Sequence, residues 1–220
     1  MALNVQDNTA FQLVIDPTVG NALKGRGNGM LNLHINPGNG VFEMYGDYTL
    51  TEGSYLFTLQ NIINKKFIIE SGSMIQWTGE PVDARLDINA VYKLKTSLQP
   101  LLNTVTASSD DDQSGSRISD RSVPVDCKIH IGGRLSNPQL DFSVVVPVTD
   151  IETQAAVASV LNTQEAQAQQ FISLVALGTF SNSGSANIGA SSGVATGLEM
   201  LTNPVSYTHL RAHETSQDLV

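Results

Sequence analysis

A strict alternation of apolar and polar residues between Ala84 and Lys95 constrains the fold of this chain more than any other feature. Apolar side chains occupy every second position, and the positions between them are polar apart from Val91. Successive side chains of a β-strand point to opposite faces of a sheet. The segment therefore predicts a strand with one apolar face and one face in water.

The same period of two recurs, with turn residues between the segments, through the first two thirds of the chain. Pro37–Gly40 predicts a hairpin turn, because its Asn-Gly pair tolerates positive φ. Thr51–Ser54 and Ser71–Ser73 predict two further turns, and Val123–Ile131 and Leu140–Val146 repeat the alternation. Residues 1–148 are therefore expected to form one long antiparallel β-system of about nine strands.

Helical signals begin only after this β-rich region. Thr149–Glu152 and Asn162–Glu165 resemble capping boxes, and each precedes a segment rich in Ala, Gln and Leu. Two short helices are predicted within residues 149–178, at about 150–161 and 163–177, and Gly178 is placed to end the second. Residues 106–121 and 179–203 are rich in Ser and Gly, which predicts a mobile loop and a flexible linker.

Composition and charge exclude several classes of partner and site. The net charge of −9 would repel a phosphate backbone, so nucleic acid is not expected as a partner. Cys127 is the single cysteine, which rules out an internal disulfide and predicts a small buried hydrophobe. Phe171–Leu177, the most apolar helical stretch, is too short to cross a bilayer, and no export signal is visible. Any membrane anchor is expected outside this sequence.

No catalytic constellation is visible, and neither an enzymatic activity, a cofactor nor a metal is expected. His34 and His130 fall on the polar faces of separate strands, where surface residues are expected rather than general bases. Gly25–Gly29 leads into a strand instead of a helix, which favours a flexible turn over a phosphate-binding loop. Asp110–Asp112 lacks the alternate spacing of a calcium loop.

Six segments, taken in order, carry a resemblance to a known family: Tyr48–Phe57, Lys66–Gly72, Ile75–Pro81, Ala84–Tyr92, Gly133–Leu140 and Asn162–Ala166. Together they resemble the carboxy-terminal domain of the TamB family, the inner-membrane component of the translocation and assembly module, in the AsmA-like superfamily. The resemblance extends from about Phe11 to about Thr202.

The resemblance implies a mainly β fold, in which an elongated antiparallel sheet curls into an open apolar trough (β-taco-like) and is followed by the two short α-helices. The residues expected to line the groove lie on the apolar faces of the predicted strands: Leu31, Leu33, Ile35, Leu86, Ile88, Tyr92, Val125, Ile129, Phe142 and Val144. Alternation by itself is more typical of a β-sandwich with a closed core, so an adhesion or interaction module stays the alternative.

The implied function is that of one part of an envelope-spanning, non-enzymatic protein. It would carry phospholipid through the apolar groove, assist outer-membrane protein assembly, or do both. The implied partners are phospholipid, an Omp85-type barrel in the outer membrane, and the inner membrane through an N-terminal anchor missing from this sequence. This region would lie in the periplasm near the outer membrane.

Residues 204–220 depart from the family pattern. Ser206–Thr215 looks like translated read-through of a sequencing adapter, so this tail is expected to be non-native and dispensable for folding. His209 and His213 have the spacing of a zinc-binding helix but lie inside the tail, and they carry no metal prediction.

Overall fold

The structure is a computed structural model that describes residues 2–16, 20–38, 40–59, 63–106, 122–147 and 150–182. The chain divides into two units, residues 1–185 and 186–220, and every described element belongs to the first. The strands are β1 (Ala2–Asp16), β2 (Asn21–Asn36), β3 (Val41–Leu59), β4 (Ile63–Ile69), β5 (Met74–Gly79), β6 (Arg85–Ser97), β7 (Ser122–Arg134) and β8 (Asn137–Val145).

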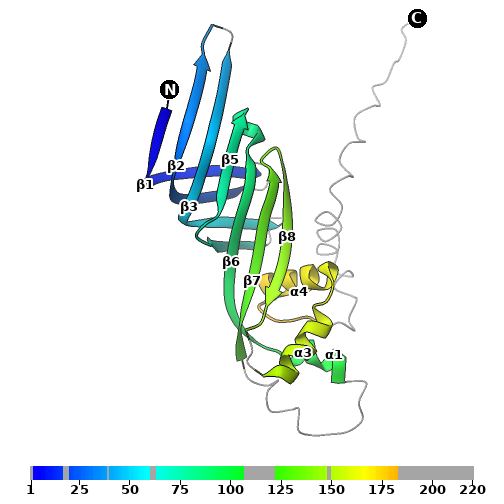
Figure 1. The fold of residues 1–220 in the computed structure, drawn as a ribbon. Helices are drawn as coiled ribbons and strands as arrows, with labels where there is room; N and C mark the ends of the chain where they lie inside the picture. The colour runs from blue at the N-terminus through cyan, green and yellow to red at the C-terminus, as the bar shows by residue number, and fades with distance from the viewer. Residues whose placement is uncertain are drawn as a thin grey trace, which may run out of the picture. The chain divides into compact units, whose positions relative to one another are not determined.

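These strands form one antiparallel sheet of eight strands, drawn in Figure 1. The order is β1-β2-β3-β4-β6-β7-β8, and β5 pairs with both β3 and β6. The predicted fold class is confirmed: the protein is mainly β, with short helices after the sheet. The number of described strands is one below the predicted nine, and all lie in a single sheet rather than the two sheets of a sandwich.

β2 and β3 are long strands that bend in the middle, so that the first half of β2 and the second half of β3, which pair with each other, run across the direction of β6 and β7 (Figure 1). The pairing register shifts between Arg26 and Gly27, which marks a β-bulge at the bend. A Cβ atom on Gly27 would lie 2.0 Å from the carbonyl oxygen of Thr49, so only glycine permits this approach of the two backbones.

Two predicted turns are therefore wrong. Gly25–Gly29 lies inside β2 and Thr51–Ser54 lies inside β3, and the two segments face each other across the bulge. The glycines serve close strand approach and bending there, not chain reversal. The predicted turn between β2 and β3 is confirmed at the described residues Pro37, Gly38 and Gly40, and Ser71–Gly72 is the turn between β4 and β5.

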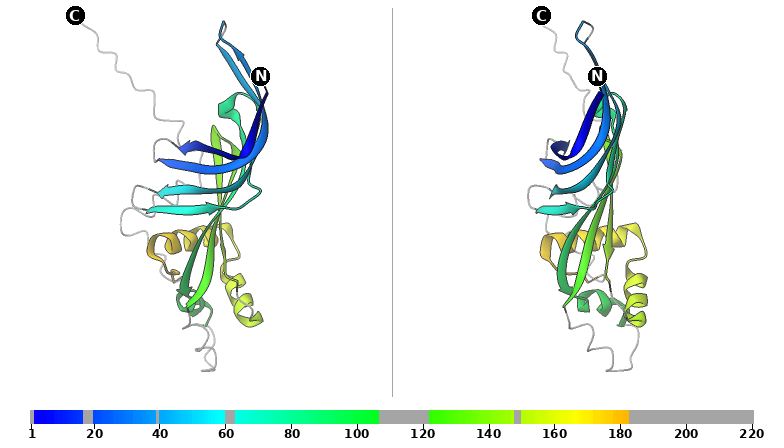
Figure 2. Two further views of the ribbon diagram at one scale, coloured as in Figure 1. Left: turned by 90° about the vertical axis from the view of Figure 1, so that its left-hand side faces the viewer. Right: turned by 60° about the vertical axis from the view of Figure 1, so that its left-hand side comes forward.

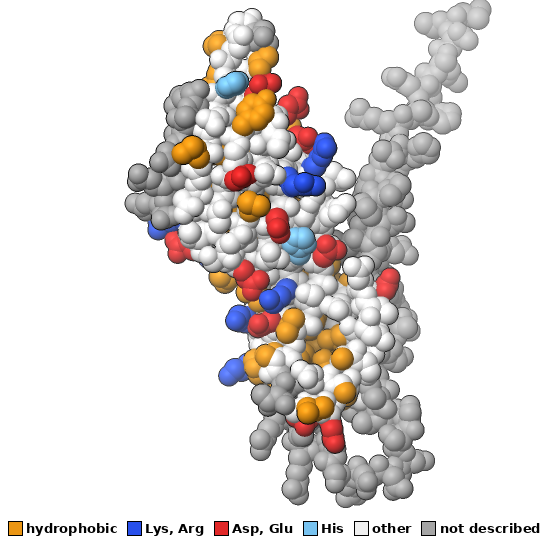
Figure 3. All heavy atoms as spheres, viewed as in Figure 1, with side chains coloured by type: hydrophobic (Ala, Val, Ile, Leu, Met, Phe, Trp, Pro, Cys, Tyr) orange, Lys and Arg blue, Asp and Glu red, His pale blue; other side chains and the backbone are white. Residues whose placement is uncertain are grey.

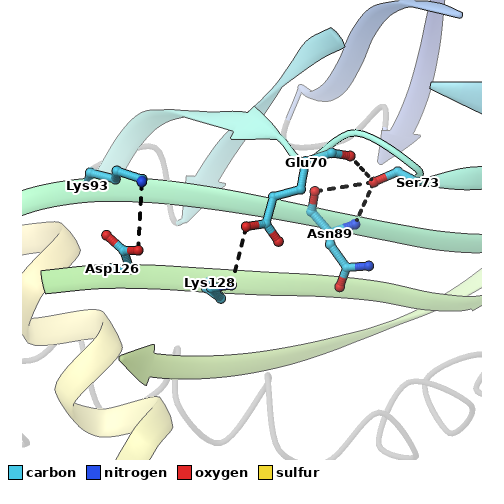
Figure 4. Close-up of polar contacts among 6 residues, drawn as sticks. All are labelled: Glu70, Ser73, Asn89, Lys93, Asp126 and Lys128. Carbon is cyan, nitrogen blue, oxygen red and sulfur yellow. Dashed lines mark hydrogen bonds and ion pairs between the residues drawn. The ribbon is translucent and has the colours of Figure 1, made fainter. Parts of the chain in front are cut away.

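β4 and β5 lie end to end in one row of the sheet, between β3 and β6. Figure 4 shows how the buried hydroxyl of Ser73 fills the break between them. The Ser73 hydroxyl donates to the Glu70 carbonyl oxygen at 2.8 Å and accepts from the backbone N–H of Asn89 at 3.0 Å. The side chain thus takes the place of a missing backbone partner in the ladder.

Replacing Ser73 with Ala should lower the free energy of unfolding by about 1–3 kcal/mol, because the Asn89 N–H loses its partner inside the sheet. Urea denaturation of the variant and the parent measures the difference. Ser71→Ala, at an exposed position of the same turn, is the matched control and should leave the midpoint in place. Equal midpoints for Ser73→Ala and the parent would contradict the role assigned to the hydroxyl.

The two helices expected after the sheet are present as α3 (Ile151–Val160) and α4 (Gln164–Leu177). Asp150 caps α3 by accepting from Thr153 N–H at 2.8 Å, and the hydrogen bonds from Thr153 hold the pKa of Asp150 below its ordinary value. Thr163 caps α4 in the same way, and Gly178, with φ of 76°, ends it.

The expectation that helices occur only after residue 149 is wrong, because α1 (Gln99–Thr106) follows β6 directly. The apolar side chains of Leu98 and Leu101 are fully buried, so packing stabilises this short helix. A short 3₁₀ turn, η1 (Pro81–Asp83), also lies between β5 and β6. The rest of the predicted mobile loop, residues 107–121, lies outside the described residues.

The first residues of the predicted flexible linker are packed against α4. Phe180 and Ser181 are buried, and the side chain of Gln170 donates to the Ser181 carbonyl oxygen at 2.9 Å and accepts from its N–H at 2.9 Å. A flexible segment starting at residue 179 is therefore wrong for these residues. Residues 183–203 of that linker and the predicted tail at 204–220 lie outside the described residues.

Candidate functional site: the apolar face of the sheet

The strand register places the ten predicted groove residues on one face of the sheet, called the apolar face below. Ile88 lies opposite Ile131 on β7, and Ile129 lies opposite Phe142 on β8. In the other direction, Leu86 lies opposite Ile75, which in turn lies opposite Tyr48 of β3. Directly opposed residues share a face. The apolar positions of separate segments therefore form one continuous surface.

One part of the apolar face is closed by α4, which lies on the same side of β6–β8 as the ends of β3 and β4 (Figure 2). The Phe171 ring of α4 lies 4.6 Å from Phe142, 5.8 Å from Phe67 and 5.9 Å from Phe57, measured between ring centroids. This aromatic cluster excludes water from the sheet at that point. Here the molecule has an ordinary packed core.

The other part of the apolar face reaches the β2–β3 hairpin and is open. Ile35 and Phe42 lie opposite each other on this face, with 59% and 46% of their surfaces exposed. Met30, Val41 and Tyr45 are also exposed, on the opposite face of the same hairpin. Large apolar side chains gathered at an exposed edge are typical of a contact surface.

The ten predicted groove residues thus divide between these two environments. Leu31, Leu86, Ile88, Val125, Ile129 and Val144 are buried, Leu33, Tyr92 and Phe142 are half-buried, and Ile35 is exposed. All ten share the predicted face, and Ile35, the one exposed residue among them, lies at the hairpin end. Phe57 and Phe67 belong to the same face and were missing from the prediction, although both fit the alternation of their strands.

The opposite side of the sheet, called the polar face below, carries the charged residues. Figure 3 looks onto this face, with the two described histidines in pale blue among acidic and basic side chains. His130 lies 3.1 Å from Asp87 and 3.6 Å from Asp141, and His34 lies 3.9 Å from Glu43. The side chain of His130 is 44% exposed and that of His34 is 69% exposed, so the prediction of surface residues is confirmed.

Cys127 lies on the apolar face of β7 and is buried, as predicted. Burial, followed by the nearby Asp126 carboxylate, raises the pKa of the Cys127 thiol to about 12. A thiol reagent should therefore label the folded protein far more slowly than the protein in denaturant, because only the exposed thiolate reacts. Labelling followed by absorbance at neutral pH tests this, and equal rates in both conditions would contradict a closed apolar face at β7.

Two further classes of site, a metal centre and a membrane-spanning helix, are absent from the described residues. No group of three or more His, Cys, Asp or Glu side chains there is arranged to hold a metal ion. No helix in those same ranges is long and apolar enough to cross a membrane.

Comparison with known proteins agrees with this arrangement. The family model for the TamB C-terminal domain matches residues 1–211, nearly the whole chain and part of the predicted tail. No curated protein and no solved structure shows a significant match. TamB proteins are envelope components of the translocation and assembly module, which works with an outer-membrane protein. This chain, whose antiparallel sheet carries one continuous apolar face, belongs to the TamB family.

Proposed function

We propose that this domain carries phospholipid along the apolar face of its sheet, as part of an envelope-spanning protein. The observation that supports the proposal is the continuity of the apolar face from β8 to the exposed end of the β2–β3 hairpin. The whole protein is proposed to reach from an anchor in the inner membrane to an Omp85-type barrel, with this domain in the periplasm near the outer membrane.

The physical basis of lipid transport is the cost of an acyl chain in water. Each CH₂ group removed from water is stabilised by about 0.8 kcal/mol, so a continuous apolar surface keeps this gain while the lipid moves. A charged headgroup costs several kcal/mol when it is buried without partners, so it should stay in water at the edge of the sheet. No covalent step is involved.

The position of α4 defines where a lipid would enter. Phe171 fills the apolar face between Phe57 and Phe142, whereas Ile35 and Phe42 are accessible. The hairpin end is therefore the proposed point of first contact. Passage further along the sheet would require α4 to move away from the aromatic cluster.

Mass spectrometry of lipids that copurify with the protein tests the proposal. Ile35→Asp, which puts a charge on the open part of the apolar face, should sharply reduce the bound phospholipid and leave the thermal midpoint nearly unchanged. Asn32→Asp introduces the same charge on the polar face of the same strand, at an exposed position, and should keep the parent's lipid content. Phospholipid absent from the parent, or equally present in both variants, would overturn the proposal.

A second candidate function is assistance in the assembly of outer-membrane proteins by strand addition. β1 is an edge strand that pairs only with β2 in the described part of the chain. An edge strand presents unpaired backbone groups to which an extended segment can bind. Ala10→Lys with Gln12→Lys should reduce capture of an unfolded barrel protein, whereas Gln139→Lys with Asp141→Lys on the other edge strand should not. Equal capture by all variants would exclude the β1 edge.

A further inference from the structure

We propose that a cavity on the polar face, over the bend in the sheet, binds the anionic headgroup of an amphiphile. The cavity has a volume of about 970 Å³, and its lining includes Lys24, Arg26, Glu52, Lys66 and Ile68. Such a volume is within the range of small-molecule sites. The site lies on the side of the sheet opposite the proposed groove, so it does not depend on that function.

Strand pairing brings the cations of the cavity together from two different strands. Lys24 and Arg26 are alternate residues of β2, and they lie opposite Ser54 and Glu52 of β3. Lys66 lies on β4, opposite Leu56 of β3. β3 alone lies between β2 and β4, so two strand spacings of about 4.8 Å and an offset of two residues along the strands put Lys66 roughly 12 Å from Lys24. Side chains of their length can converge on one small anion across that distance.

The charge of this cavity is opposite to that of the chain. The chain carries a net charge of −9, whereas the cavity is lined by three cations and the single carboxylate of Glu52. Arg26 lies 3.5 Å from Glu52. No carboxylate among the described residues lies within salt-bridge distance of Lys24 or Lys66. Two lysines with no described acidic partner, in an acidic protein, favour an anionic ligand.

An apolar strip beside these cations indicates that the ligand has an apolar part as well as an anionic group. Ile68 is 56% exposed in the cavity wall, and Val14 and Leu56 are exposed on the same face. Ile68 also lies opposite Val91, the one apolar residue on the polar side of β6. Large exposed hydrophobic residues next to basic ones match a molecule with an anionic head and an apolar tail. Among anionic headgroups, a phosphate group is the one that lysine and arginine side chains bind best together.

Liposome flotation with the full chain tests the proposal. The protein should bind vesicles of equal parts phosphatidylcholine and phosphatidylglycerol, and not vesicles of phosphatidylcholine alone. Lys24→Gln with Lys66→Gln should weaken this binding by about 25-fold, since each lysine near an anionic surface contributes about fivefold. Arg85→Gln with Lys95→Gln removes the same charge at exposed positions outside the cavity and should bind as the parent does.

Two further variants separate the possible sources of binding. Ile68→Asn should weaken vesicle binding severalfold but leave a calorimetric titration with inorganic phosphate unchanged. Phe42→Asp puts a charge at the proposed entrance of the groove and reports on vesicle binding through the apolar face. If both double lysine or arginine variants lost vesicle binding equally, the binding would be a diffuse charge attraction, and the proposal would be overturned. Equal binding of the parent to neutral and anionic vesicles would also overturn it. Full vesicle binding by Ile68→Asn would show a site for a free anion only, also overturning it. If Phe42→Asp alone lost vesicle binding, the vesicles would bind through the apolar face. That result would overturn this inference and support the proposed groove.

Discussion

Ile88→Asp should unfold the domain or lower its free energy of unfolding by about 4 kcal/mol or more. Ile88 is fully buried on the apolar face, opposite Ile131 and beyond the reach of water. The substitution loses the burial of a large apolar side chain and places a carboxylate on the apolar face, opposite Ile131, where no described cation pairs with it. Because a domain of this kind is stable by about 5–15 kcal/mol, the change threatens folding itself. Circular dichroism and urea denaturation measure it.

Asn89→Asp is the matched control, because it introduces the same carboxylate one residue later, on the exposed side of the strand. It should melt within a few degrees of the parent. If Ile88→Asp were as stable as Asn89→Asp, water would have to reach the apolar face at β6, and α4 would not close it. Since unfolding at Ile88 is expected whether or not lipid binds elsewhere, the groove has to be tested at the open hairpin end.

Phe171→Ala should cost about 3–5 kcal/mol, because it removes the central ring of the aromatic cluster between α4 and the sheet. It should also loosen α4 over Phe57, Phe67 and Phe142, so that an apolar dye binds the variant and not the parent. Urea denaturation gives the stability, and dye fluorescence below the unfolding transition gives the exposure of the apolar face.

Leu177→Ala, at an exposed position near the end of the same helix, is the control and should change neither quantity. A double-mutant cycle with Phe142→Ala isolates the contact at 4.6 Å, for which a coupling of about 0.5–1.5 kcal/mol is expected. A loss below 1 kcal/mol for Phe171→Ala, with no change in dye binding, would mean that α4 does not hold the apolar face closed.

The β-strands could be predicted from the sequence because alternation is a local property. Ile88 and Ile129 lie on the face that their neighbours indicate, and pairing only confirms it. Glycine carries less local information. Gly27 permits either a reversal of the chain or the close approach of another backbone, and only its pairing with Leu50 decides for the second. The two turns that were wrongly predicted, at Gly25–Gly29 and Thr51–Ser54, both result from this ambiguity of glycine.

α1 left a weak signal that could have been used. Ser97 accepts from the N–H of Gln99 at 3.1 Å, and Pro100 lies in the first helical turn, an arrangement typical of a helix start. The cavity on the polar face left no signal along the chain. Lys24 and Lys66 each look like ordinary solvent-exposed residues of an alternating strand, and only the pairing of β2, β3 and β4 places them at one site.

The late position of α4 in the chain has a consequence for synthesis. Phe57 and Phe67 emerge from the ribosome long before Phe171, the residue that packs on both of them. Until residues 164–177 have been made, the aromatic patch has no cover, and nascent sheet edges with exposed apolar surface are prone to aggregate. The sheet of an incomplete chain therefore keeps this apolar surface exposed, and the domain can reach its packed form only after α4 has been made.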